Sequence, residues 1–73
     1  MQHDPKAILG RAIREERRKL NLSQEDFSEI CDLHRTYLGA VERGEKNISL
    51  VNIIRISQAL KLSVEALFGK AGL

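Results

Sequence analysis

A turn of only three residues, Asp32-Leu33-His34, separates two short stretches of helical pattern at about 24–31 and 35–42. Apolar residues recur every three or four positions in each stretch, which is typical of an amphipathic helix. Two short helices joined this closely suit a helix-turn-helix, in which the second helix projects from the rest of the fold. We therefore expect a helix-turn-helix over about residues 24–42 whose second helix is presented outward.

Capping residues predict three further helices around this unit. Asp4-Pro5 is a helix start, because the aspartate accepts from free backbone amides and proline fits the first helical position. Serine is the N-cap expected at three other helix starts, Ser23, Ser49 and Ser63. Gly44 is expected to end a helix in the left-handed conformation, and Gly69 and Gly72 predict a frayed tail. The expected helices cover residues 5–20, 24–31, 35–42, 50–60 and 64–68.

Length and composition limit the chain to one small helical domain. Its 73 residues hold a single core, and an apolar content of 42% with 30% charged residues is typical of a globular chain. The start of the chain lacks the long apolar region of a secretory signal, and no apolar run approaches the roughly 18 residues of a membrane span. We therefore expect a single all-α domain over residues 1–73, located in the cytoplasm.

The sequence contains little that catalysis or metal binding would need. It has no acidic pair flanked by an apolar pocket, no Ser-His-Asp set beyond chance and no glycine-rich phosphate loop. The single cysteine, Cys31, excludes an intrachain disulfide and a Cys-based zinc site. With Phe27 and Ile30 it is expected on the inward stripe of its helix, as a small apolar filler. We expect a binding protein, not an enzyme, with no metal, cofactor, small-molecule ligand or membrane partner.

The charged residues are unevenly distributed, although the net charge is only +2. Basic residues dominate positions 6–19, acidic residues dominate 25–32, and basic residues return at Arg35, Arg43 and Lys46. This distribution favours a molecule with one face toward a polyanion. The alternative is that these are ordinary solvated helix faces, and the charges alone favour that alternative.

The helix expected at 35–42 has an unusual outward face. At about 100° per residue, Leu38 and Val41 lie on one side, and Arg35, Thr36 and Gly39 lie roughly opposite. A glycine inside a helix costs about 1 kcal/mol relative to alanine. We therefore expect something to approach the backbone closely at Gly39, and a helix–helix crossing there is the alternative.

Four motifs carry a family resemblance: LSQEDF, VERG, NISL and ALKLSVEALF. Over about residues 7–68, the chain resembles the Cro/CI-type (XRE) helix-turn-helix family. Its segments HRTYLGAVERG and NISLVNI most resemble the controller proteins of restriction-modification systems. The resemblance implies a compact five-helix, lambda-repressor-like domain that binds double-stranded DNA. It also implies a small homodimer that binds operators upstream of its own gene and times endonuclease expression.

The resemblance also implies roles for individual residues. Arg35 and Thr36 match the first exposed positions of the recognition helix, where an arginine can donate two bonds to a guanine edge. Ala40 stands where the family often has a polar base reader, which leaves more of the direct reading to Arg35. The residues expected to contact DNA are Gln24, His34, Arg35, Thr36, Tyr37, Gly39, Arg43, Lys46 and Asn47.

Several of these residues have a structural alternative. Gln24 matches the family glutamine that bonds a phosphate and buttresses the recognition helix, but a solvated side chain is the alternative. His34 caps a helix or meets a phosphate, and the cap is favoured. Tyr37 is as well suited to packing as to a phosphate. Arg17 and Glu42 match a family pair that forms a partly buried salt bridge between the first and third helices, and two exposed side chains are the alternative.

Residues 50–68 carry more apolar side chains than a five-helix core of this size needs. We expect part of this surface to form a two-fold interface. A dimer doubles the base contacts and makes a palindromic operator the natural target. The alternative is that all of these side chains pack within one chain. The expected interface residues are Val51, Ile54, Leu67 and Phe68.

The sequence therefore predicts an autoregulating transcription regulator, associated with the nucleoid, that binds a palindromic operator as a homodimer. Two alternatives stay open. One is a phage or mobile-element repressor of the same fold. The other is a protein–protein interaction module such as an antitoxin, for which no salt-dependent DNA binding is expected.

Overall fold

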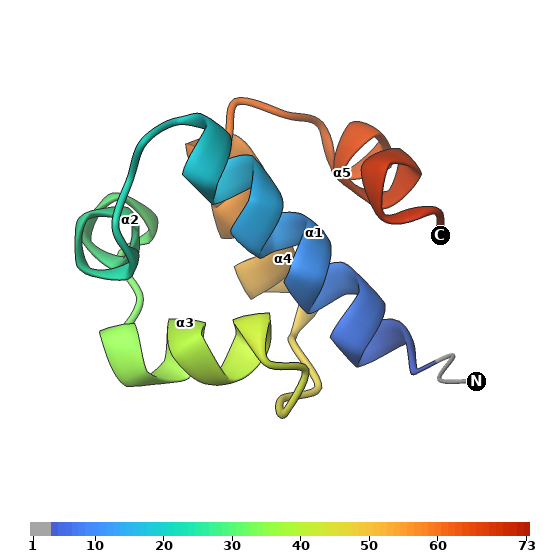
Figure 1. Cartoon of the computed structure of the whole chain (residues 1–73), viewed down its shortest axis with the longest axis horizontal. Helices are drawn as coiled ribbons and strands as arrows, with labels where there is room; N and C mark the ends of the chain where they lie inside the picture. The colour runs from blue at the N-terminus through green and yellow to red at the C-terminus, as the bar shows by residue number, and fades with distance from the viewer. Residues whose placement is uncertain (1–3) are drawn as a thin grey trace.

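Each of the five helices in the described part of the chain begins at a side chain that caps its free amides (Figure 1). The computed structural model describes residues 4–73, so the domain expected over residues 1–73 includes three residues outside this range. The predicted all-α fold class is confirmed. The helices are α1 (Pro5–Lys19), α2 (Gln24–Cys31), α3 (Arg35–Glu42), α4 (Leu50–Ala59) and α5 (Val64–Ala71).

The helix starts lie where the capping residues predict them. The Ser23 hydroxyl accepts from the backbone amide of Asp26 at 3.0 Å, and Asp4 accepts from an amide in the first turn of α1. Ser49 and Ser63 act in the same way on the amides three residues ahead. Each such cap contributes about 1 kcal/mol to helix stability. These starts were predictable because a cap bonds an amide only two or three residues away.

The helix ends also use local backbone conformation. Asp32 adopts the left-handed conformation with φ 58° and turns the chain from α2 toward α3. Gly44 adopts φ 78° just after α3, as predicted. A Cβ at Gly44 would lie 2.6 Å from the Cα of Ala7, so the end of α3 packs directly on α1. Glycine is therefore required at this position both for its conformation and for its lack of a side chain.

The expectation of a frayed tail after residue 68 is wrong. The last helix, α5, extends to Ala71, and Gly72 ends it in the left-handed conformation with φ 79°. The amide of Leu73 then bonds the carbonyl of Phe68 at 2.9 Å. This hydrogen bond satisfies one of the free carbonyls at the helix end, as in a Schellman motif.

The core is built from the apolar stripes of all five helices. Its completely buried side chains include Ile13 of α1, Phe27 of α2, Leu38 of α3, Ile56 of α4 and Leu67 of α5. The first helix packs on α3 and α5, and the second helix packs on α3 and α4. These contacts hold α3 along one edge of the molecule, the lower edge in Figure 1, with its outer face open.

The close crossing of two helices lies at Gly10 of α1, not at Gly39. A Cβ at Gly10 would clash with the carbonyl oxygen of Val41 and lie 2.8 Å from that of Glu42. The absence of a side chain at Gly10 therefore lets α1 approach the last turn of α3. This approach brings the middle of α1 next to the helix-turn-helix.

Two sequence expectations about which side chains face inward are wrong. Ile30 is 56% exposed, whereas Phe27 and Cys31 on the same helix are buried. Leu67 is completely buried in the core of its own chain, so it does not contribute the dimer surface assigned to it. Phe68 is half-buried and packs against the same core. None of the helices within residues 4–73 has the length and apolar character that crossing a membrane requires.

Candidate nucleic-acid interface

Helix α3 presents its first turn to solvent. Leu38 and Val41 anchor its inner face in the core, and Arg35 and Thr36 are exposed. Within the described residues the Arg35 guanidinium has no hydrogen-bond or ion-pair partner. Arg35 therefore carries five free donors in a planar fork at the start of a helix.

His34 serves as the N-cap of α3. Its Nδ1 accepts from the backbone amide of Thr36 at 3.1 Å. This bond requires an unprotonated Nδ1, which places the ring proton on Nε2. The ring is exposed, so the Nε2–H donor faces solvent beside Thr36. The favoured interpretation of His34 as a cap is confirmed, and one donor remains for an outside acceptor.

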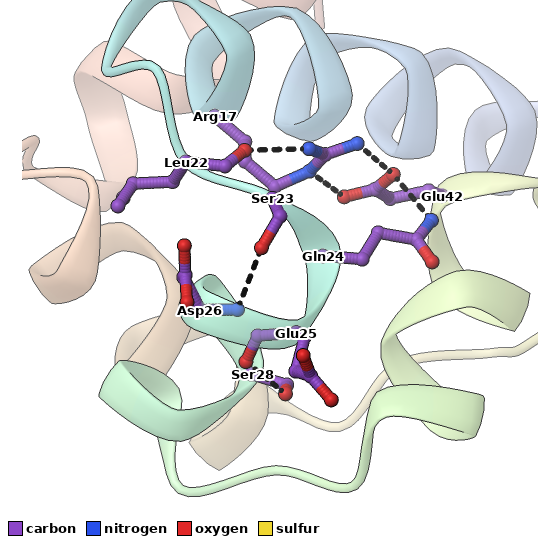
Figure 2. Close-up of polar contacts among 8 residues, drawn as sticks. All are labelled: Arg17, Leu22, Ser23, Gln24, Glu25, Asp26, Ser28 and Glu42. Atoms are coloured by element: carbon purple, nitrogen blue, oxygen red, sulfur yellow. Dashed lines mark hydrogen bonds and ion pairs between the residues drawn. The ribbon is translucent and has the colours of Figure 1, made fainter.

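A buried ion pair joins α1 to the last residue of α3 (Figure 2). Arg17 of α1 donates from Nε to Glu42 Oε2 at 2.7 Å and from Nη2 to Glu42 Oε1 at 3.0 Å. Its Nη1 donates to the carbonyl of Leu22 at 2.7 Å. The side chains of Arg17 and Glu42 are only 8% and 2% exposed. The structure thus contains the predicted pair between the first and third helices, in a bidentate geometry.

Gln24 joins this network from the first position of α2. Its Nε2 donates to Glu42 Oε1 at 3.0 Å, so one amide hydrogen is used inside the chain and one remains. The Glu42 carboxylate of α3 therefore accepts hydrogen bonds from both α1 and α2, and it links the three helices. This arrangement accounts for the buttressing role expected of Gln24, and it leaves a single donor for a phosphate.

Gly39 is buried beneath neighbouring side chains. A Cβ at this position would lie 3.2 Å from Arg43 Nη1 and 3.4 Å from Gln24 Oε1. The ends of the Gln24 and Arg43 side chains therefore lie close to Gly39, and the expected approach of a partner to its backbone stays a prediction. Gly39 also lines a hollow of about 220 Å³, together with Gln24, Arg35, Thr36 and Arg43.

Tyr37 packs inward and keeps its phenol group at the surface of α3 and α4. The ring packs against the core, and the phenol oxygen accepts from Asn52 Nδ2 of α4 at 3.1 Å. The phenol hydrogen is not used in that bond and can be donated outward. Tyr37 also lines a shallow groove with Ala40, Arg43 and Lys46. The tyrosine therefore links α3 to α4 and borders the same exposed surface as Arg43.

Arg43 is held by an acidic neighbour at the end of α3. Its Nε and Nη2 donate to the Glu45 carboxylate at 2.9 and 3.2 Å. The hydrogen bonds with Glu45 raise the pKa of Arg43, and the Arg43 guanidinium lowers the pKa of the Glu45 carboxyl. Both side chains are more than half exposed. Such surface pairs are worth about 0–1 kcal/mol, so a phosphate can replace the carboxylate at little cost.

The structure brings most of the predicted DNA-contacting residues onto one surface but leaves Asn47 apart. Lys46 is exposed and borders the groove beside Arg43. Asn47 borders a different cavity, together with Pro5 of α1 and Phe68 of α5. Among the predicted residues, Asn47 therefore lies on the other side of the α3–α4 loop from Arg43 and Lys46.

Sequence reasoning missed two arginines that lie next to the predicted residues. Arg14 and Arg18 of α1 line a hollow together with Gln24 and Arg43. The basic run at 6–19 was the available signal. It did not distinguish which arginines share a surface with α3, because that depends on how closely α1 approaches α3 at Gly10.

The chain is similar to proteins of known family and structure. The family model described as "Helix-turn-helix" matches residues 13–67. The control protein C.SmaI of Serratia marcescens is 47% identical over 70 residues, which cover 96% of this chain and 83% of that protein.

Solved structures show the same likeness. The restriction-modification controller protein C.AhdI from Aeromonas hydrophila superposes with a TM-score of 0.86 at 39% identity, over 90% of this chain and all of that one. The biofilm regulator SinR, solved in complex with DNA, gives a TM-score of 0.77 at 26% identity, over 82% of this chain and 97% of that one. The chain therefore belongs to the XRE-type helix-turn-helix family of DNA-binding transcription regulators, and its relatives in that family include restriction-modification controllers.

Proposed function

We propose that this chain is a restriction-modification controller that binds an operator near its own gene, with α3 in the major groove. The observation that carries the proposal is the free, exposed guanidinium of Arg35 at the start of α3. An arginine in this position of a recognition helix reaches base edges, and its fork matches guanine O6 and N7. Thr36 beside it can contact a thymine methyl group or a phosphate. Such a protein acts in the cytoplasm, on the nucleoid.

The other exposed donors fit a role in positioning. His34 Nε2, the Tyr37 phenol and the side chains of Arg43 and Lys46 surround the Arg35 turn. Contacts of this kind to phosphates fix the register of a protein on DNA without reading its sequence. We assign base reading to Arg35 and Thr36 and phosphate binding to the surrounding donors. Gln24 joins the second group with its remaining amide hydrogen.

We also propose that the chain acts as a homodimer on a palindromic operator. The support is an apolar patch on α4, where Leu50, Val51 and Ile54 are 67%, 60% and 38% exposed. Three large apolar side chains on consecutive turns of one helix are costly to leave in water. Pairing this patch with a second copy across a two-fold axis would cover it and place two α3 helices on one duplex. Val51 and Ile54 of the sequence prediction remain in this proposed interface.

Replacing Arg35 by lysine tests the base-reading role, because lysine keeps the charge but loses the planar fork. The operator duplex is first obtained by in vitro selection with the parent protein, and affinities are then measured on this duplex and on a random-sequence duplex. We expect Arg35→Lys to lower the ratio of operator affinity to random-duplex affinity roughly 5- to 150-fold. This factor corresponds to a loss of about 1–3 kcal/mol of discrimination between the two duplexes. Lys70→Ala, which removes an exposed charge from α5, should leave the ratio unchanged.

Two results would contradict these proposals. An unchanged affinity ratio for Arg35→Lys would remove Arg35 from base reading. Parent binding that does not weaken as salt rises would exclude the DNA-binding function itself, because each neutralised phosphate releases counterions. That second result is the one expected of a protein–protein interaction module with this fold.

A further inference from the structure

A second hollow lies between α1 and the helix-turn-helix, beside the surface assigned to DNA. Its volume is about 420 Å³. Four arginines and one glutamate line it, which gives it a formal charge of +3. The lining residues are Arg14, Arg17, Arg18, Gln24, Glu42 and Arg43.

The charge of this hollow is only partly balanced within the chain. Each nitrogen of the Arg17 guanidinium donates to Glu42 or to the Leu22 carbonyl. Arg43 is paired with Glu45. Arg14 and Arg18 are exposed, and neither guanidinium has a partner among residues 4–73. Among the described residues, no unengaged carboxylate lines the hollow. Two free arginines thus line a polar hollow whose carboxylate, Glu42, is already engaged by Arg17 and Gln24.

Helix stabilisation does not explain both arginines. A basic residue near a helix C-terminus interacts favourably with the helix dipole, but this effect is confined to about the last turn. Arg18 lies in the last turn of α1, and Arg14 lies one turn earlier. The dipole therefore accounts for Arg18 at most, whereas an anion in the hollow accounts for both residues.

This hollow is continuous with the surface at α3. Gln24 and Arg43 line both hollows, so donors extend from Arg35 through these two residues to Arg14 and Arg18. A DNA strand is an extended row of phosphates, and arginine binds a phosphate in a bidentate manner. The continuity favours a phosphate of the same duplex over an unrelated anion.

We propose that Arg14 and Arg18 bind a backbone phosphate of the operator, beyond the base pairs that α3 contacts. This inference rests on the proposed DNA-binding function and extends its footprint onto α1. The two arginines contribute to affinity for any duplex and do not read sequence, because phosphates carry no base identity. The buried Arg17–Glu42 pair between them keeps the walls of the site fixed.

The test compares three double variants of the full chain. Arg14→Gln with Arg18→Gln removes both charges, and Arg14→Lys with Arg18→Lys keeps them. Lys61→Gln with Lys70→Gln is the matched control, since it removes two charges from the α4–α5 loop and α5, away from α3 in Figure 1. Affinity for the selected operator and for a random duplex is measured across a potassium chloride series, and circular dichroism verifies folding.

We expect the Arg14→Gln, Arg18→Gln variant to bind both duplexes more weakly by the same factor. The slope of log affinity against log salt should become shallower by about 0.9 for each lost phosphate contact. The lysine variant should keep a slope close to that of the parent. If the glutamine variant matches the Lys61→Gln, Lys70→Gln control in slope and affinity, the proposed phosphate site is wrong although the protein binds DNA. A parent that binds neither duplex overturns the proposed function instead.

Discussion

Replacing Glu42 by alanine should destabilise the fold far more than its single charge suggests. Glu42 accepts from Arg17 at 2.7 and 3.0 Å and from Gln24 at 3.0 Å, in a site where both members of the ion pair are less than 10% exposed. Without the carboxylate, the Arg17 guanidinium keeps only its bond to the Leu22 carbonyl. A buried charge then remains without its counter-charge.

The size of the effect follows from that unpaired charge. Breaking a buried ion pair by removing one partner costs about 3–5 kcal/mol. A domain of this length has a total stability of about 4–11 kcal/mol. For such a small domain each kcal/mol corresponds to about 4–8 °C in melting temperature, so Glu42→Ala should melt at least about 12 °C lower. A substantial fraction of the variant is then unfolded at moderate temperature.

Thermal melting followed by circular dichroism, with urea unfolding as a second measure, checks this expectation. Glu29→Ala is the matched control, because it removes one exposed carboxylate from the neighbouring helix. The double variant Arg17→Met with Glu42→Leu should recover most of the loss, since apolar residues of similar size replace buried ion pairs at little cost. Equal melting temperatures for Glu42→Ala and Glu29→Ala would refute the reasoning, as would a double variant no more stable than Glu42→Ala.

Three further outcomes are expected. Glu45→Gln should raise affinity for operator and random duplexes alike by about two- to fivefold, because Arg43 no longer has to leave a carboxylate partner before it binds a phosphate. Unchanged binding would contradict this. Val51→Asp with Ile54→Asp should sediment as a monomer at micromolar concentration where the parent is a dimer, and a monomeric parent would end the dimer proposal. Burial raises the pKa of the Cys31 thiol from 9.0 to about 11. The unfolded chain therefore loses this proton first, and the parent should lose more stability than Cys31→Ala between pH 9 and 11. Equal losses in urea titrations would count against that interpretation.

The features that could be predicted from the sequence depend on neighbouring residues. The serine caps and the left-handed Gly44 act over two or three positions, so the starts of all five helices and the end of α3 followed directly. The resemblance to the family then identified the Arg17–Glu42 pair. The two residues are 25 positions apart, and this separation by itself does not predict a contact. Such a pair is visible in a sequence only through resemblance.

The misplaced side chains have a different cause. Ile30 lies at helical spacing from Phe27, but the core does not extend far enough around α2 to cover it. At Gly39 the helical angle did not indicate that Gln24 from another helix and Arg43 from the next turn lie within 3.4 Å of the position of a Cβ. Arg14 was not assigned because its neighbours on α2 and α3 are set by the crossing at Gly10. All of these depend on how helices pack, which single-helix periodicity does not encode.

The exposed turn of α3 separates target choice from folding. The side chains of Arg35 and Thr36 have no hydrogen-bond or ion-pair partner within residues 4–73, whereas the interactions that hold α3 in place belong to Leu38, Val41 and Glu42. With the base-reading roles proposed for them, substitutions at the first two positions are expected to alter which operator is preferred while the melting temperature stays nearly constant. Regulators of this kind can diverge toward new promoters by drift at two side chains, without first acquiring compensating mutations elsewhere.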